Sequence, residues 1–412
     1  MDGLKSFLFC AVLAALIWIV PIEGQVSVFG QETALPATDA TETVTMDPGQ
    51  SEYYSGTDAC CESTCGDCLS YSCCAQPRLY GYIEAVFLDY DNRHPDRVIA
   101  VDTAMYDNGN GDGDYVLMTT GNTNLDVEPG FRFLVGYALN QCWAIEFGYL
   151  GIYDWEGSAT ITGEDNLAIP GDLGLASNDF FNGDVFRVHR SSELHSFELM
   201  PVRSFCCCCP SASCCEDSCG CESSCGCGPS CGGGGSDCCG TTYDTRCFSL
   251  LAGFRYLRLN ENFNLNGTDF DEGTSDYHIR TKNDLYGFQL GARWRRGYGC
   301  WGWEVTGKAG IYGNDCEQQQ YVTDFPPPFM LREPRHHRDG KVAFVGELNL
   351  NLTYQLTQCW GIRGGYNFMW LNGVALAPDQ LDFTHTAYSG TGLRNSGAAF
   401  LHGASIGVEA CW

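Results

Sequence analysis

The amino-acid sequence predicts an all-β protein, an antiparallel transmembrane β-barrel of about ten strands within a range of ten to twelve. Three observations predict it. Apolar and polar side chains alternate in repeated stretches between residues 79 and 412, with the period of a half-buried strand. The connections between these stretches are short and long in turn, as in membrane barrels. The last stretch, 400–412, ends on Trp412 and has one apolar and one small or polar face.

Residues 1–24 are predicted to be a signal peptide. Lys5 precedes an apolar run from Phe7 to Val20, and the small residue Gly24 follows. A run of about 14 residues is short for a membrane-spanning helix, so an anchor helix is the weaker alternative. No later stretch has 18 continuous apolar residues, which excludes a helical membrane protein.

Residues 25–78 are predicted to be a disordered leader that contains the first cysteine cluster. The leader is rich in Thr, Ala, Glu and Gln and has no periodicity. The cysteines of this cluster lie between residues 60 and 74. The barrel is then expected to occupy residues 79–412.

Ten stretches are candidate strands of the barrel, and an even number is what bacterial barrels have. Before a cysteine-rich insertion at 206–246 they are 79–90, 131–139, 143–149 and 193–205. After it they are 248–256, 286–294, 301–311, 342–354, 360–370 and 400–412. Extra hairpins within the long connections would raise the count to twelve.

The connections and the apolar face favour a membrane barrel over a soluble β-sandwich, which is the alternative. Tight turns are expected at 139–142, 295–300 and 356–359, and long outer loops at about 91–127, 154–192, 259–284, 314–340 and 371–397. The apolar face carries many Trp, Tyr and Phe near strand ends. A sandwich core would favour Leu, Ile and Val, whereas membrane barrels carry aromatic girdles.

The polar face of the strands contains charges of both signs, which in a membrane barrel would face the lumen. These lumen-facing pore candidates are Glu146, Arg255, Arg293, Glu304, Lys308, Glu347, Arg363 and Glu409. The expected aromatic girdle at the periplasmic rim is Trp143, Trp301, Trp360 and Trp412.

Cysteines precede the aromatic residue at the start of several strands. The five expected periplasmic-rim thiols are Cys142, Cys247, Cys300, Cys359 and Cys411. Because the last two candidate strands are joined by one loop, Cys359 and Cys411 are expected to reach bonding distance if the strand register allows it.

The cysteine-rich segments have three interpretations. Twenty-six cysteines in an exported chain favour disulfides within or between chains, in an oxidising compartment. Cys-x-Cys steps at 219/221 and 225/227 have metal-ligand spacing, but no histidine completes a defined zinc site. The third interpretation is no specific role. A disulfide-linked homo-oligomer or envelope partner follows from the first, and no metal site is predicted.

The net charge of −28 argues against nucleic-acid binding, which needs a basic surface. The Asx/Gly loop 107–114 is read as a plain turn, with calcium binding as the alternative, so no cofactor is predicted. A local basic patch at 332–338 is read as a solvated loop, with an anionic lipid or lumen contact as the alternative. No nucleophile motif accompanies the scattered histidines, so the chain is not expected to be an enzyme.

Four motifs resemble planctomycete-type outer-membrane β-barrel proteins, with a looser similarity to legionella-type pore-forming outer-membrane proteins. The motifs lie at 129–132, 251–257, 364–368 together with 377–380, and 400–404. The resemblance covers the barrel but not the cysteine clusters. It implies an outer-membrane location, contact with membrane lipid and a porin-like pore for small solutes. The alternative is a non-conducting structural barrel that anchors a disulfide-cross-linked, cysteine-rich envelope layer.

Overall fold

The computed structural model describes residues 79–92, 96–103, 115–123, 125–140, 142–209, 244–325, 329–357 and 359–411. They all belong to one compact unit, Ser63–Trp412. They form one antiparallel sheet of twelve strands, which confirms the predicted all-β fold. The predicted signal peptide, the whole predicted leader and the centre of the cysteine-rich insertion lie outside the described residues.

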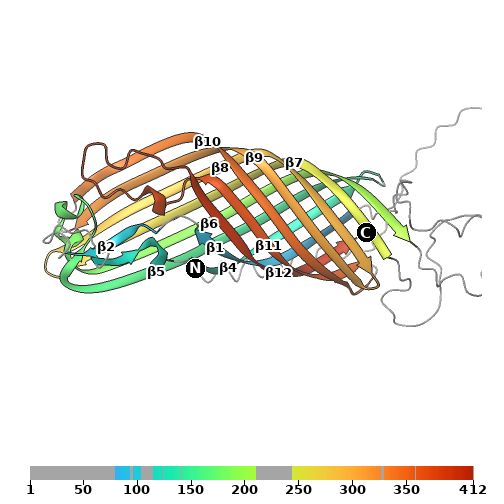
Figure 1. Ribbon diagram of the computed structural model, residues 1–412, viewed down its shortest axis with the longest axis horizontal. Coiled ribbons are helices and arrows are strands. Elements are labelled where there is room, and N and C mark those ends of the chain that lie inside the picture. The colour runs from blue at the N-terminus through green and yellow to red at the C-terminus, as the bar shows by residue number, and fades with distance from the viewer. Residues whose placement is uncertain are drawn as a thin grey trace, which may run out of the picture. The chain divides into compact units, whose positions relative to one another are not determined.

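Ten of the twelve strands form a closed ring (Figure 1). Going round it, the order is β5-β4-β1-β12-β11-β10-β9-β8-β7-β6, and β6 pairs with β5 again. The short strands β2 (Val98–Asp102) and β3 (Val116–Thr119) pair with each other outside the ring, and β2 also pairs with β5. The ten ring strands coincide with the ten stretches predicted from the sequence.

The ring strands have two lengths. The short strands are β1 (Leu79–Asn92), β4 (Leu125–Ala138), β11 (Trp360–Val374) and β12 (Gly397–Cys411). The long strands are β5 (Trp143–Ala168), β6 (Phe181–Cys209), β7 (Asp244–Asp269), β8 (Gly273–Tyr298), β9 (Trp301–Phe325) and β10 (Phe329–Gln355). The prediction of long loops at 154–192, 259–284 and 314–340 was therefore wrong, because most of these residues continue the strands as paired hairpins.

The two ends of the barrel differ in their connections. One end, here called the turn end, has the tight connections next to Cys142, Cys300 and Cys359, together with Cys411 near the C-terminus. The opposite end, here called the hairpin end, is formed by the distal parts of β5 to β10. Figure 1 shows these strands extending well past β11 and β12.

The apolar face of the strands changes side partway along the barrel. On β8, Tyr286, Phe288 and Leu290 are exposed on the outside, whereas Leu285 and Tyr277, nearer the hairpin end, are buried inside. On β7 the change falls between the outward Phe254 and the buried Leu257.

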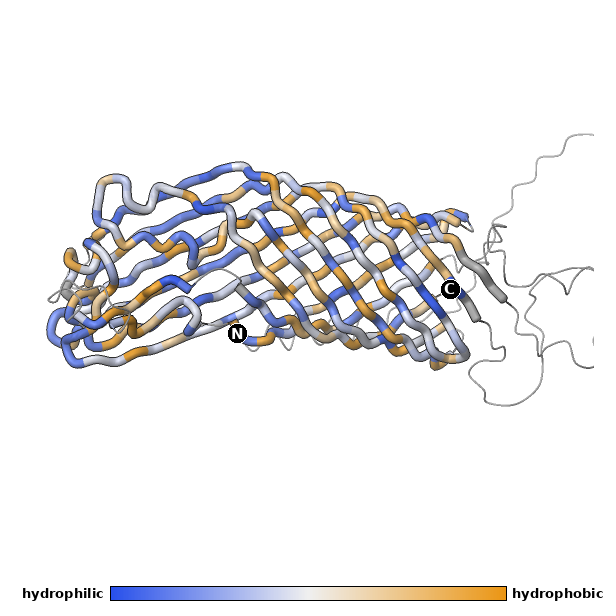
Figure 2. The backbone as a smooth tube through the Cα atoms, in the orientation of Figure 1, coloured by the Kyte–Doolittle hydropathy of each residue, from blue (hydrophilic) through white to orange (hydrophobic). Residues whose placement is uncertain are grey.

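The outward apolar stretch on β8 runs from Tyr286 to Trp294, about the nine to eleven residues that a tilted strand needs to cross a bilayer. Figure 2 shows the corresponding alternation of hydrophobic and polar residues toward the turn end. The remaining part of β8, Gly273–Leu285, adds roughly 40 Å of strand beyond this band at about 3.3 Å per residue. We call this part of the barrel the extension, and its interior combines an apolar cluster with buried polar side chains such as Glu261, Asn283 and Arg332.

Among the described residues, none of the helices has the length and apolar character needed to cross a membrane.

Candidate functional site: the barrel lumen

The lumen near the turn end is filled by charged side chains that we call the ionic layer. It contains six carboxylates and six cations, most of them buried. They are Glu84, Glu146, Glu198, Glu304, Glu347 and Glu409 with Arg132, Arg255, Arg293, Arg295, Lys308 and Arg363. The formal charges of this set cancel.

Arg293 connects two walls of the barrel. It extends from β8 and donates two hydrogen bonds, of 2.6 and 2.8 Å, to the carboxylate of Glu146 on β5. Tyr80 donates a third hydrogen bond to this carboxylate, at 2.7 Å. Because β8 and β5 are three strands apart in the ring, the pair crosses the lumen. The side chains of both charged residues are at least 93% buried.

Arg363 on β11 joins two other walls in the same way. It donates one 2.6 Å hydrogen bond to Glu84 on β1 and another of 2.6 Å to Glu304 on β9. Glu409 lies 3.5 Å away from the same guanidinium group. Arg363 therefore ties together strands on both of its sides.

Arg255 forms a third bridge, from β7 to Glu347 on β10, at 2.7 Å. Glu198 is 3.2 Å from the same guanidinium nitrogen, and Lys308 contacts both Glu198 and Glu347 at 2.8 and 3.0 Å. Buried charges cost several kcal/mol each unless they are paired in this manner. This pairing accounts for the presence of charged residues inside the lumen.

One small cavity lies within the ionic layer. It has a volume of about 30 Å³ and is lined by Glu146, Arg293 and Asn349, among others. A space of this size holds about one water molecule. The Asn349 side-chain oxygen has no hydrogen-bond partner among the described residues, and one water would supply it.

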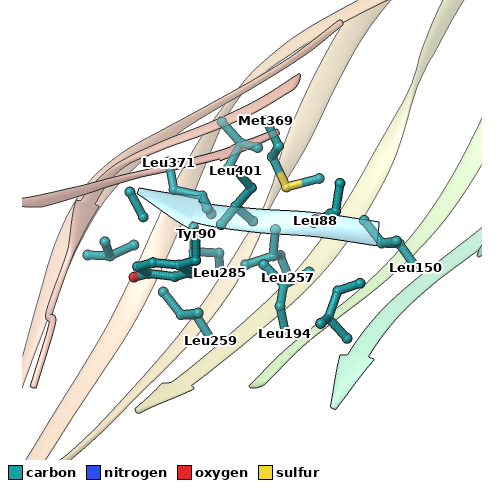
Figure 3. Close-up of a cluster of buried hydrophobic side chains, with 14 of the residues drawn as sticks. Leu88, Tyr90, Leu150, Leu194, Leu257, Leu259, Leu285, Met369, Leu371 and Leu401 are labelled. Carbon is teal, nitrogen blue, oxygen red and sulfur yellow. The ribbon is translucent and has the colours of Figure 1, made fainter. Parts of the chain in front are cut away.

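An apolar layer lies next to the ionic layer, toward the hairpin end (Figure 3). Every strand of the ring contributes at least one buried side chain to this cluster. Leu257, Leu259 and Leu285 point inward from β7 and β8, and Leu371 and Leu401 do so from β11 and β12. These five side chains have no exposed surface. A water-filled channel at this level would expose them, so the described side chains close the lumen here.

The interior of the extension is partly filled by the connection between β11 and β12, residues 375–395, here called the plug segment. Its first part is inside, where Ala375, Leu376 and Ala377 are fully buried, whereas residues 384–388 are exposed. Asn283 binds both backbone groups of Ala375, donating to its oxygen at 2.8 Å and accepting from its nitrogen at 2.7 Å. The carboxylate of Glu261 accepts the backbone N–H of Ala377 at 2.7 Å.

Two arginines hold the middle of the plug segment. Arg332 donates to the backbone oxygens of Asp382 and Thr384 at 2.9 and 2.7 Å. Arg97 donates to those of Asp379 and Leu381 at 2.8 and 2.9 Å. The residues of the predicted basic patch are therefore separated: Arg332 is buried against the plug segment, whereas Arg338 is exposed and paired with Asp315. A register shift in β10 between Arg332 and Arg335 lies between them.

The electrostatic environment of the extension is uneven. Burial, together with the neighbouring carboxylate of Asp324, raises the pKa of Asp179 to about 6. Ser275 donates a 3.1 Å hydrogen bond to the Asp179 carboxylate and partly offsets this shift.

Three acidic side chains lie close together in the extension. One carboxylate oxygen each of Asp165, Asp184 and Asp269 lies within 4.8 Å of the other two. The backbone N–H groups of Asp165 and Phe270 already bind the Asp184 carboxylate.

All eight pore candidates named from the sequence belong to the ionic layer. The sequence interpretation did not include Glu84, Arg132, Glu198 and Arg295. Arg132, Glu198 and Arg295 share the polar parity of their strands, so the same alternation rule would have found them. Of the plug segment, only residues 377–380 were named, as part of a motif, and nothing in the sequence indicated that they lie inside the barrel.

The five predicted rim cysteines all lie at the turn end. Cys142 and Cys247 each take part in a disulfide bond, and Cys300 and Cys359 are free thiols. Of the expected girdle, Trp143 and Trp301 are exposed on the outside and Trp360 is partly buried. Trp412 and the loop 107–114 lie outside the described residues.

Comparisons with known proteins were made for the whole chain. The family model described as "Putative beta barrel porin-7 (BBP7)" matches residues 99–321 and 336–411. No curated protein matches the chain.

Among solved structures, the chain is similar to the outer membrane protease OmpT from Escherichia coli, at 8% identity and a TM-score of 0.40, over 83% of this chain and 100% of that one. A FadL homologue of Pseudomonas aeruginosa has 8% identity and a TM-score of 0.22, over 81% and 90%. An anion-selective porin from Comamonas acidovorans has 10% identity and a TM-score of 0.13, over 81% and 98%.

Proposed function

The chain belongs to the putative beta barrel porin-7 family of outer-membrane β-barrels, and we propose that it is a closed structural barrel rather than an open diffusion pore. In this function the barrel anchors the cysteine-rich segments to the outer membrane and holds the extension above it. The observation that carries the proposal is the set of arginine bridges that cross the lumen between strands two or three positions apart.

The two further layers support the same function. An aqueous path through the barrel would have to pass the ionic layer, the apolar layer and the plug segment in succession. Ten-stranded barrels are narrow: those of eight strands are filled by side chains, and those of 16 to 18 leave a channel. Moving the bridges apart would expose several charges to an apolar surrounding, which is costly.

The proposed anchoring function uses the turn end of the barrel. β6 ends at Cys209 and β7 begins at Asp244, so the cysteine-rich insertion starts and finishes at this end. Short turns face the periplasm in bacterial barrels, which would place these cysteines in an oxidising compartment. Disulfides to a second copy or to an envelope protein are the proposed attachment.

The second candidate function is the porin-like pore for small solutes. The description of the family favours it, and it requires that the plug segment and the bridges move. The signal peptide, the absence of catalysis, the calcium alternative at 107–114 and the relation to planctomycete-type proteins all stay predictions.

Solute uptake by liposomes distinguishes the two functions. The refolded chain is compared with protein-free vesicles and with vesicles that contain an open porin of 16 strands. Heat-dependent gel mobility checks that the chain is folded. The proposal predicts that vesicles with the chain take up a small sugar no faster than protein-free vesicles. Uptake at a rate close to that of the open porin would support the pore.

A further inference from the structure

Cys359 and Cys411 are cross-strand neighbours at the turn end. The register pairs Trp360 with Ala410, so the next pair outward is Cys359 with Cys411. The Cys411 N–H donates a 3.0 Å hydrogen bond to the Cys359 oxygen. Residues directly opposite in an antiparallel pair have Cα atoms about 4.5 to 5.5 Å apart and share one face of the sheet.

This placement suits a disulfide bond. Bridged cysteines have Cα atoms about 4.4 to 6.8 Å apart, a range that includes both kinds of antiparallel pair. The backbone at Cys359 is also held in place, because Thr357 accepts hydrogen bonds from the N–H groups of Cys359 and Trp360 at 3.3 and 3.0 Å. The bond therefore needs little backbone movement.

Both residues are in the thiol form in the structure, and Cys359 is exposed. An oxidant of protein size can thus reach one of the two sulfurs. Cys300 lies at the same end, also as a thiol, but its backbone oxygen binds the N–H of Gln355. Cys300 therefore faces a residue that cannot form a disulfide.

We propose that Cys359 and Cys411 are a site of oxidative modification, at which a disulfide joins β12 to β11. The oxidant is a disulfide-bearing thiol oxidoreductase. One Cys thiolate attacks the disulfide of the oxidoreductase and forms a mixed disulfide with it, releasing one thiol of the oxidant. The second Cys thiolate then attacks the sulfur of the first cysteine, and the other thiol of the oxidant leaves. The pair loses two protons and two electrons as its S–S bond forms, and the bond of the oxidant breaks to give two thiols.

The position of this bond gives it a consequence for the barrel. β12 lies between β11 and β1 and completes the ring. The hairpin of β11 and β12 also includes the plug segment. A bond between residues 359 and 411 closes this hairpin covalently at its base, so the plug segment stays attached to two strands that cannot separate at the turn end.

The test is peptide mapping of the full chain after export into an oxidising envelope. The protein is alkylated with N-ethylmaleimide under denaturing conditions without reductant and digested with trypsin. Cleavage yields the peptides 342–363, 395–412 and 297–308, each with a single cysteine: Cys359, Cys411 and Cys300 respectively. We expect the first two as one linked species, two hydrogens lighter than their sum and separated by reduction. Cys300 is the control and should be alkylated.

A Cys359→Ser variant, which removes one thiol and little volume, completes the test. In this variant Cys411 should become alkylated. Alkylation of both Cys359 and Cys411 in the unchanged chain would overturn the proposal. So would linkage of either peptide to another cysteine peptide, or a Cys411 that stays unlabelled in the variant.

Discussion

The bridge between Arg293 and Glu146 gives a quantitative test of whether the lumen is dry. Replacing Arg293 by Met leaves the Glu146 carboxylate buried, with the Tyr80 hydroxyl as its one remaining hydrogen-bond donor among the described residues. It also removes the neighbour that Glu304 has at 3.9 Å. Breaking a buried pair on one side typically costs about 3–5 kcal/mol, and we expect a loss of this size in the free energy of unfolding.

The converse substitution should cost less. In Glu146→Gln, Arg293 still has the carboxylate of Glu304 nearby and still donates its 3.3 Å hydrogen bond to Thr306. We expect a loss of about 1–3 kcal/mol, the cost of a weakened hydrogen bond to a charged group. The double variant with Met at positions 146 and 293 has no unpaired charge and should be close to the unchanged chain.

The assay is equilibrium unfolding in urea of protein refolded in small vesicles, followed by tryptophan fluorescence and by gel mobility. A double-mutant cycle then separates the pair from its surroundings. If water fills the lumen, the pair behaves like a surface ion pair and contributes about 0–1 kcal/mol. A loss below about 1 kcal/mol for Arg293→Met, no larger than that for Glu146→Gln, would refute the reasoning.

Three further predictions concern the apolar layer, the plug segment and pH. Leu257→Ala should lower the free energy of unfolding by about 2–5 kcal/mol because it leaves a cavity, while Asn262→Ala on the exposed face should change it by less than about 0.5 kcal/mol. Glu261 accepts the backbone N–H of Ala377 in the plug segment and pairs with the buried Arg190, so Glu261→Gln should weaken this contact and make hydrogen exchange of the plug segment faster. Unchanged exchange would contradict the role of Glu261 in holding the plug segment. Because the pKa of Asp179 is raised to about 6, its protonation stabilises the extension below about pH 4 and this stability is lost as the pH rises through 6. Asp179→Asn should therefore protect the extension from proteolysis at pH 7.5 but not at pH 4, and an equal effect at both would count against the shift.

Strand alternation was enough to predict the ten strands of the ring and eight of the twelve charged residues of the ionic layer. Side chains of one parity lie on one face, so Glu146, Arg293 and Arg363 had to share the lumen once the strands were paired. Their partners were not predictable in the same way. Which carboxylate meets which arginine across the lumen depends on the stagger of ten strands, and that is a property of the closed ring.

The extension was missed because its alternation has the opposite parity. Tyr256 and Leu257 are adjacent apolar residues, the first facing out and the second in, and the same holds for Leu285 and Tyr286. Read with one parity, residues 259–284 lose their pattern and appear to be a loop. Read with the parity changed at each apolar pair, they predict a strand that leaves the bilayer and buries its apolar face inside.

The plug segment has no comparable signal. Residues 375–395 are held mainly through their backbone groups, by side chains from β7, β8, β9 and β10 and by Arg97. Backbone groups are the same in every sequence, so this recognition leaves little trace in the identity of the residues bound.

Single-channel conductance in a planar bilayer tests the central claim most directly. The full chain, refolded and shown by gel mobility to be inserted, is added to a bilayer in 1 M salt, a condition chosen to make any open pore visible. A closed structural barrel predicts a flat current at moderate voltage, whereas an open porin of 16 strands gives conductance steps under the same conditions. Regular conductance steps from the unchanged chain would contradict it.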